Sequence, residues 1–167
     1  IQRLAKASKA GVSIQLLVRG ICCLLPGVPG ETENISVISI VGRFLEHSRI
    51  YCFGAREEIE VYISSGDMMT RNTEKRVEIA CPILNGQLKK RILSMLDIMF
   101  VDNVKAREMH LDGSYTCRKP GNEHPVNAQE IFVEQALHPG VPEVERDGTS
   151  FRERFHRYLE LRRKSKK

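Results

Sequence analysis

Two basic side chains in this sequence have the chemistry to handle phosphate: Arg19 in LLVRG and His47 in RFLEHSRIYCF. Arginine presents a planar fork of permanently charged donors that matches a pair of phosphoryl oxygens. Histidine titrates near neutral pH, so it can protonate a leaving oxygen or carry a phosphoryl group as a nucleophile. Arg19 and His47 are therefore the candidates for a site that binds and transfers phosphate.

A third polar group follows in SSGDMMTRN, where Arg71 is a further candidate phosphate ligand. The small residues of this segment are expected to leave backbone N–H groups accessible to an anion. Structural alternatives stand beside these roles. Arg19 could be an ion-pair partner, His47 a histidine at a strand edge, and Asp67 the N-cap of a helix over MMTRN.

These side chains lie where the predicted strands end. Apolar and β-branched runs predict strands over 13–19, 35–42, 48–54, 60–66, 75–83 and 104–111, and the run at 35–42 is typical of a strand buried on both faces. In α/β sheets ligands bind where strands end and loops begin, so we expect the polar groups to converge on one pocket. The pattern indicates an α/β domain around one mixed sheet flanked by helices.

Helical spacing predicts a helix over 86–100 and a second helix that starts at Asn127, its N-cap, and ends before Gly140. The segment GSYTCRKPGNEHPV predicts a loop or a short hairpin. We expect one domain over 1–145 and a charged helical tail over 146–167. IQRLAKASKAG resembles the second half of a helix and lacks an initiator Met, which suggests a piece of a longer protein.

Composition is that of a folded protein, with 41% hydrophobic and 28% charged residues among 167. The net charge of +5 comes from the tail, because residues 152–167 hold eight Lys or Arg against two Glu. The five cysteines lack metal-ligand spacing and indicate reduced thiols.

No apolar run approaches the roughly 20 residues of a membrane span, and no signal peptide is evident. We expect a cytoplasmic protein, with membrane association left open, and no nucleic-acid partner.

Longer segments resemble a known family. VRGICCL, FLEHSR, EVYISSGDMMTRN, DNVKARE and PVNAQE, in this order, resemble the last catalytic domain of the long bacterial polyphosphate kinases. The resemblance implies a phospholipase D-like fold and a role in moving the terminal phosphoryl group of ATP onto polyphosphate. It implies that Arg19 and His47 line the nucleotide and phosphoryl site, with Arg71 as a third member.

The same resemblance implies what this chain lacks. The phosphorylated histidine and the Mg²⁺ ligands of the family lie in preceding domains, so the isolated chain is expected to be inactive. The full-length form is expected to bind ATP, ADP and polyphosphate and to form a homo-oligomer. His47 would then assist a phosphohistidine that lies elsewhere.

Two alternatives stay open at this stage. A phospholipase D-like phosphodiesterase would use His47 as its own nucleophile, but Arg49 replaces the signature Lys and Gly54 replaces the signature Asp. A polyanion-binding module would use the basic tail over 152–167 and no catalysis.

Overall fold

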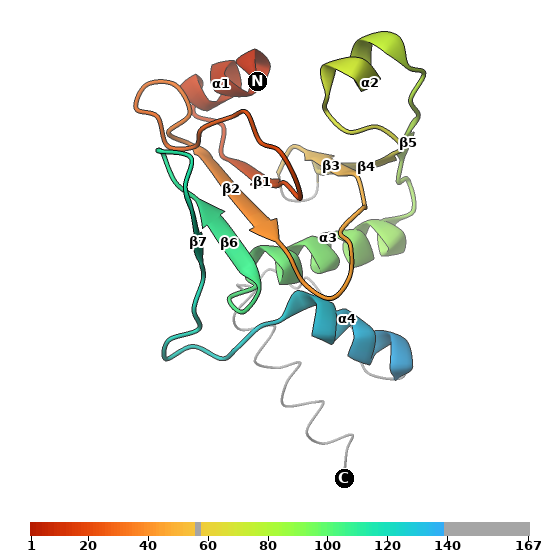
Figure 1. Cartoon of the computed structure of the whole chain (residues 1–167). Helices are drawn as coiled ribbons and strands as arrows, with labels where there is room; N and C mark the ends of the chain where they lie inside the picture. The colour runs from red at the N-terminus through yellow and green to blue at the C-terminus, as the bar shows by residue number, and fades with distance from the viewer. Residues whose placement is uncertain (56–57, 139–167) are drawn as a thin grey trace. The chain divides into compact units, whose positions relative to one another are not determined.

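The chain forms two compact units in the computed structural model (Figure 1). The structure describes residues 1–55 and 58–138. Among the described residues, unit 1 comprises 1–46 and 97–138, and unit 2 comprises 47–55 and 58–96. The predicted tail helix and the expected domain boundary at 145 lie outside the described residues.

Unit 1 is built on a mixed four-stranded sheet of order β1-β2-β6-β7. Its strands are β1 (Ile14–Leu17), β2 (Ile35–Ile40), β6 (Ala106–Met109) and β7 (Tyr115–Cys117). β1 and β2 are parallel, whereas β2 pairs with β6 and β6 with β7 in antiparallel register, as Figure 1 traces. Helices α1 (Gln2–Lys9) and α4 (Ala128–Leu137) belong to the same unit.

The core of unit 1 lies on β2, as its apolar sequence predicts. Four consecutive residues of this strand, 37–40, are buried, which requires cover on both faces. Val37 and Ile35 form a cluster with Leu24 and Met109, and Leu4 of α1 packs against it. The hydrophobic face of α1 therefore anchors this helix to the unit.

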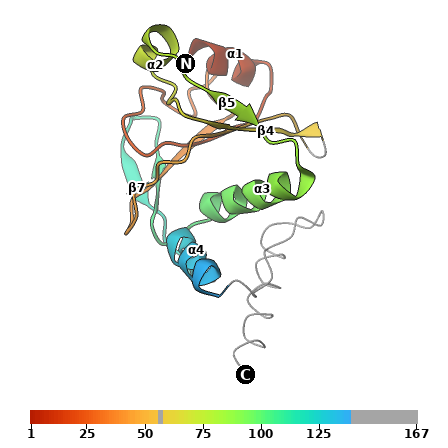
Figure 2. The same ribbon diagram turned by 90° about the vertical axis from the view of Figure 1, so that its right-hand side faces the viewer.

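Unit 2 carries an antiparallel three-stranded sheet of order β3-β4-β5. Its strands are β3 (Ile50–Phe53), β4 (Glu60–Ser64) and β5 (Ala80–Pro82), and α2 (Thr70–Lys75) lies between β4 and β5 in the sequence. β4 and β5 run side by side in Figure 2. The mixed α/β class is thus confirmed, but hydrogen bonds divide the described strands between two sheets, where the sequence pattern had predicted one.

The predicted strand over 75–83 is mostly wrong. Residue 75 ends α2, and only residues 80–82 pair with β4. The ladder stops at Ile79 because its N–H donates to the Ser65 hydroxyl oxygen, at 3.0 Å, and not to a strand carbonyl. Val77, which lies within the predicted strand, is 98% exposed.

Both longer predicted helices are confirmed, and so is the predicted N-cap of the second. α3 (Gly86–Phe100) is capped by Asn85, whose Oδ1 accepts from the N–H groups of Gln87 and Leu88 at 2.9 and 3.1 Å. Asn127 caps α4 by accepting from the Glu130 N–H at 3.4 Å. The segment over 113–126 contains β7, so β6 and β7 form the short hairpin that was one of its two predictions.

None of the helices in the described ranges has the length and apolar character needed to cross a bilayer.

Candidate functional site

His47 lies on the surface of unit 2, three residues before β3, with the guanidinium of Arg49 against its ring. The Arg49 Nη1 and His47 Nδ1 atoms are 3.3 Å apart, and the Arg49 Nη2 and His47 Nε2 atoms are also 3.3 Å apart. Arg49 Nη1 also donates to the His47 carbonyl oxygen at 3.3 Å. Both ring nitrogens are thus beside one cation, and the side-chain pair forms a single basic surface.

Asp67 holds the other side of the Arg49 guanidinium. Arg49 Nε donates to Asp67 Oδ1 at 2.9 Å and Arg49 Nη2 donates to Oδ2 at 3.4 Å, which is a bidentate pair. The Arg49 side chain is 18% exposed and the Asp67 side chain 37%. The guanidinium therefore has a fixed orientation beside His47.

The β3–β4 register brings this pair together. Ile50 pairs with Ile63, and the ladder continues because the Ser64 N–H donates to the Arg49 carbonyl at 2.9 Å. Asp67 follows three residues later, where the chain turns away from β4. Two side chains 18 residues apart in the sequence thus meet at one end of the sheet.

Asp67 is not the N-cap of α2, which was the structural role weighed for it from the sequence. α2 begins after Met69, its N-cap, which makes no side-chain capping hydrogen bond. The Asp67 carboxylate pairs with Arg49, while its backbone carbonyl accepts from Asn72 Nδ2 at 3.2 Å. The conformation of the segment around Asp67 is therefore fixed by its ion pair with Arg49 and its hydrogen bond from Asn72.

The predicted anion-binding backbone of SSG is also wrong. The Ser64 N–H bonds the Arg49 carbonyl, the Ser65 N–H bonds the Ile79 carbonyl at 3.0 Å, and the Gly66 N–H bonds the Ser64 hydroxyl at 3.2 Å. The first two donors join β4 to β3 and to the approach to β5, and the third is taken by a side chain of its own segment. Basic side chains, and not these amides, must carry any phosphate site here.

Gly54, at the position of the phospholipase D signature Asp, has a conformation that suits only glycine. Its φ is +90°, and a Cβ there would lie 3.1 Å from the Glu58 carbonyl oxygen. An aspartate would therefore strain the β3–β4 connection. Asp67 reaches the basic pair from a different segment, so the carboxylate of unit 2 does not follow the phospholipase D pattern.

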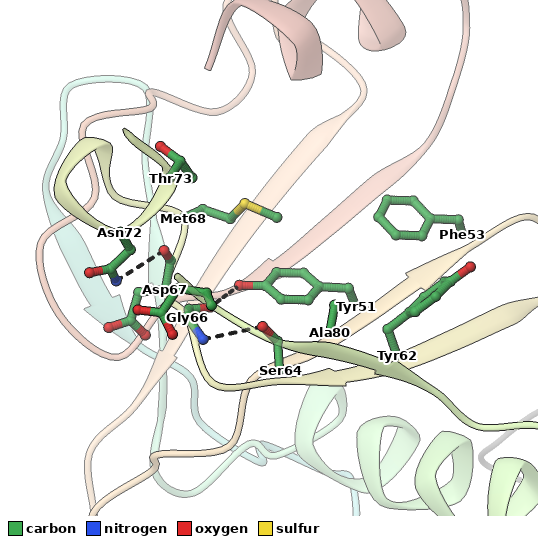
Figure 3. A pocket seen from close by; sticks show the side chains of 11 residues that line it. Tyr51, Phe53, Tyr62, Ser64, Gly66, Asp67, Met68, Asn72, Thr73 and Ala80 are labelled. Carbon is green, nitrogen blue, oxygen red and sulfur yellow. Dashed lines mark hydrogen bonds between the residues drawn. The ribbon is translucent and has the colours of Figure 1, made fainter. Parts of the chain in front are cut away.

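A pocket of about 320 Å³ opens beside Asp67 in unit 2 (Figure 3). Tyr51, Phe53 and Tyr62 give it aromatic walls, and the only charged groups in its described lining are the carboxylates of Asp67 and Glu78. A lining of this charge repels phosphate. The pocket therefore does not extend the basic surface formed by His47 and Arg49.

Tyr51 ties this pocket to the strand end. Its hydroxyl donates to the Gly66 carbonyl at 2.8 Å, as Figure 3 shows. Burial raises the pKa of the Tyr51 phenol, the Asp67 carboxylate raises it further, and the Arg49 cation opposes both. Tyr51 is thus a neutral hydrogen-bond donor at physiological pH.

The other two predicted site residues are exposed on separate elements. Arg19 lies two residues after β1 in unit 1, and Arg71 lies in the first turn of α2 in unit 2. Within the described ranges no ion pair involves Arg19. The structure brings together His47, Arg49 and Asp67. Of these, only His47 was predicted from the sequence to be a site residue.

The described residues contain no group of three or more His, Cys, Asp or Glu side chains that could hold a metal ion.

Comparison with known proteins gives concordant matches. A family model described as polyphosphate kinase C-terminal domain 2 matches residues 1–129. The polyphosphate kinase of Bacillus cereus is 50% identical over 129 residues, which are 77% of this chain and 18% of that protein. The polyphosphate kinase of an Exiguobacterium species is 45% identical over 172 residues, covering 100% of this chain and 23% of the relative.

A solved structure shares the fold. The crystal structure of polyphosphate kinase from Porphyromonas gingivalis matches with a TM-score of 0.78 and 42% identity, covering 82% of this chain and 21% of that chain. This chain thus spans about a fifth of the length of the proteins it matches.

Proposed function

Because the chain belongs to the family of polyphosphate kinase C-terminal domains, we propose that it contributes half of the site that transfers the terminal phosphoryl group of ATP to polyphosphate. The observation that carries this proposal is the His47–Arg49–Asp67 cluster. It places a titratable ring and an oriented guanidinium together on the surface of unit 2. Phosphoryl transfer depends on such positioned charge to stabilise the oxygens of the transferred group.

His47 and Arg49 have distinct roles in this proposal. A histidine of a preceding domain attacks the γ-phosphorus, the bond from that phosphorus to the β–γ bridging oxygen breaks, and ADP leaves. His47 protonates or orients that leaving oxygen, an effect worth about 10² to 10⁴ in rate. Arg49, held by Asp67, faces the same charge with its remaining N–H donors. The terminal oxygen of polyphosphate then attacks the phosphohistidine and releases the first histidine.

Arg19 is proposed to stabilise the charge on the equatorial oxygens of the transferred group, and Arg71 to bind phosphate. Arginines in this role are worth on the order of 10³ to 10⁵ in other phosphoryl-transfer enzymes. Magnesium enters with ATP and is held outside the described part of this chain. We propose a full-length homo-oligomer in the cytoplasm that binds ATP, ADP and polyphosphate.

The test is polyphosphate synthesis from ATP by the full-length enzyme carrying His47→Ala or Arg19→Ala. We expect each substitution to lower kcat by at least a hundredfold. Glu74→Gln, which changes an exposed carboxylate on α2, is the control and should retain activity. Near-normal synthesis by either alanine variant would remove that residue from the site.

The two alternative functions have less support. The phosphodiesterase alternative requires a carboxylate in the phospholipase D position, and Gly54 cannot provide it. The polyanion-binding tail lies outside the described residues.

A further inference from the structure

The segment that leads into His47 has no regular structure of its own, yet its backbone is fixed. Residues 42–46 follow β2, and the side chains of Phe44 and Leu45 are 49% and 76% exposed. These side chains therefore bury too little surface to hold the segment. Polar contacts to its backbone must do so.

Gln129 provides these contacts from α4. Its Oε1 accepts from the Phe44 N–H at 3.0 Å, and its Nε2 donates to the Phe44 carbonyl at 2.8 Å. The same Nε2 donates to Glu46 Oε1 at 2.7 Å. The amide of Gln129 thus pairs with both backbone groups of Phe44, as a neighbouring strand would, and reaches the residue directly before His47.

Gln129 is itself held rigidly. It is 4% exposed and belongs to the first turn of α4, where the preceding Ala128 N–H donates to Asp102 Oδ2 at 2.8 Å. Asp102 is fully buried, and its Oδ1 accepts from three successive backbone N–H groups, those of residues 104–106. DNVKARE and PVNAQE, two segments without a role in the chemistry, therefore form one support.

Gly42 completes the arrangement. A Cβ at this position would lie 2.4 Å from Gln129 Oε1 and 3.0 Å from its Cδ. Because Gln129 is buried and bonded three times, it has no room to move away. Only glycine at position 42 lets the segment lie against the Gln129 amide.

We infer that Gln129 is a positioning residue for phosphoryl transfer, acting through Phe44 and Glu46 on His47. This inference rests on the proposed function of His47. The peptide that carries His47 starts from a fixed point in unit 1, set by Gln129, Gly42 and Asp102. A misplacement of a reacting group by about 1 Å can lower the rate on the order of 10²-fold.

The test uses the full-length enzyme with Gln129→Ala and with Gln129→Glu. We expect kcat for transfer from ATP to fall about 10- to 100-fold in both, while KM for ATP changes less than about threefold. Gln129→Glu is nearly isosteric, but it places a second carboxylate against Glu46. Adding Glu46→Gln to Gln129→Glu restores a donor and acceptor between these two side chains but leaves the Phe44 carbonyl without its donor, so it should recover only part of the lost kcat.

Gln135→Ala, on the same helix at a partly exposed position, is the matched control and should keep the activity of the unmodified enzyme. His47→Ala is measured in parallel. If His47→Ala retains activity, the proposed function fails, whatever Gln129 does. If His47→Ala is inactive, unchanged kcat in Gln129→Glu, an effect on KM alone, or no recovery with Glu46→Gln would overturn the positioning role. If Gln129→Ala does not fold, the comparison of Gln129→Glu with the double variant Gln129→Glu, Glu46→Gln still tests the positioning role.

Discussion

At the scale of single residues, Arg49 connects a titratable ring to a carboxylate. Its guanidinium has five N–H donors, of which Nε and one Nη2 donor face Asp67 while the two Nη atoms also lie along His47. A lysine at this position would supply one compact charge and no planar fork. The planar fork of Arg49 is therefore matched by the two carboxylate oxygens of Asp67.

Asp67→Asn tests this pairing. The substitution keeps one acceptor for Arg49 Nε but removes the charge that fixes the guanidinium. Because the Asp67 side chain is 37% exposed, solvent screening limits the loss, and we expect kcat of the full-length enzyme to fall about tenfold, or about 1.4 kcal/mol. Glu78→Gln, which changes the other carboxylate of the pocket, is the comparison. Equal activity of Asp67→Asn and the unmodified enzyme would show that Arg49 needs no orienting partner.

Tyr51→Phe tests the hydrogen bond to Gly66 through its pH dependence. The raised pKa of Tyr51 means that the folded state favours the protonated phenol. This stabilisation is present below the ordinary tyrosine pKa of about 10 and is lost as the pH rises through the higher pKa of the folded state.

We therefore expect Tyr51→Phe to lower the free energy of unfolding by about 1 kcal/mol at pH 7. The difference between the two proteins should shrink above about pH 10. Urea unfolding at both pH values measures it. A difference that grows with pH would contradict the assigned direction.

At the scale of elements, Asp102 joins the end of α3, the start of β6 and the start of α4. Its carboxylate accepts four backbone N–H groups, and the neighbouring Asn103 bonds the Val126 backbone through both its main chain and its side chain. These contacts fix the loop between 102 and 106 and hold α4 at a defined place in unit 1. This arrangement explains why two polar residues, Asp102 and Asn103, follow the C-terminal end of α3.

Asp102→Asn should lower the free energy of unfolding of the chain by about 3 kcal/mol. The amide group of Asn would face the Ala128 N–H, so one buried donor loses its acceptor. Asp112→Asn changes an exposed carboxylate in the β6–β7 turn and should cost less than about 0.5 kcal/mol. Chemical denaturation of both variants gives the comparison, and similar losses would argue against the buried role of Asp102.

Elements with strong local signals were predictable from the sequence. Asn85 and Asn127 each precede a run of apolar residues at helical spacing, so the predicted starts of both helices were correct. β5 was not predictable because its N-terminal limit depends on the Ser65 hydroxyl, which takes the Ile79 N–H across the sheet. The N-terminal end of β5 is set by a tertiary contact that no local pattern contains.

The site shows the same division between local and tertiary information. His47 could be singled out because its residue type carries phosphate chemistry and its segment resembles a family. The partnership of Arg49 with Asp67 requires the β3–β4 register. The role of Gln129 requires the contact between α4 and a segment 85 residues earlier in the chain. The spacing of residues in the sequence predicts neither the Arg49–Asp67 contact nor the contact of Gln129 with Phe44.

At the scale of the whole molecule, the chain corresponds to a small part of the enzymes it matches. It spans about a fifth of the proteins it aligns with, and our proposal takes further reacting groups from other domains. The cluster on unit 2 has a proton carrier and a cation, and our mechanism takes the nucleophile and the metal ligands from elsewhere. We accordingly expect the 167-residue chain alone to give no polymer from ATP.

A single-turnover experiment tests the central claim most directly. Full-length enzyme with His47→Ala is mixed with ATP labelled in the γ-phosphoryl group and with a polyphosphate primer, and the rate of label transfer to polymer is compared with that of the unmodified enzyme. Our mechanism predicts a rate at least a hundredfold lower, since ADP would leave without a proton donor at the bridging oxygen. Transfer at the rate of the unmodified enzyme would contradict it.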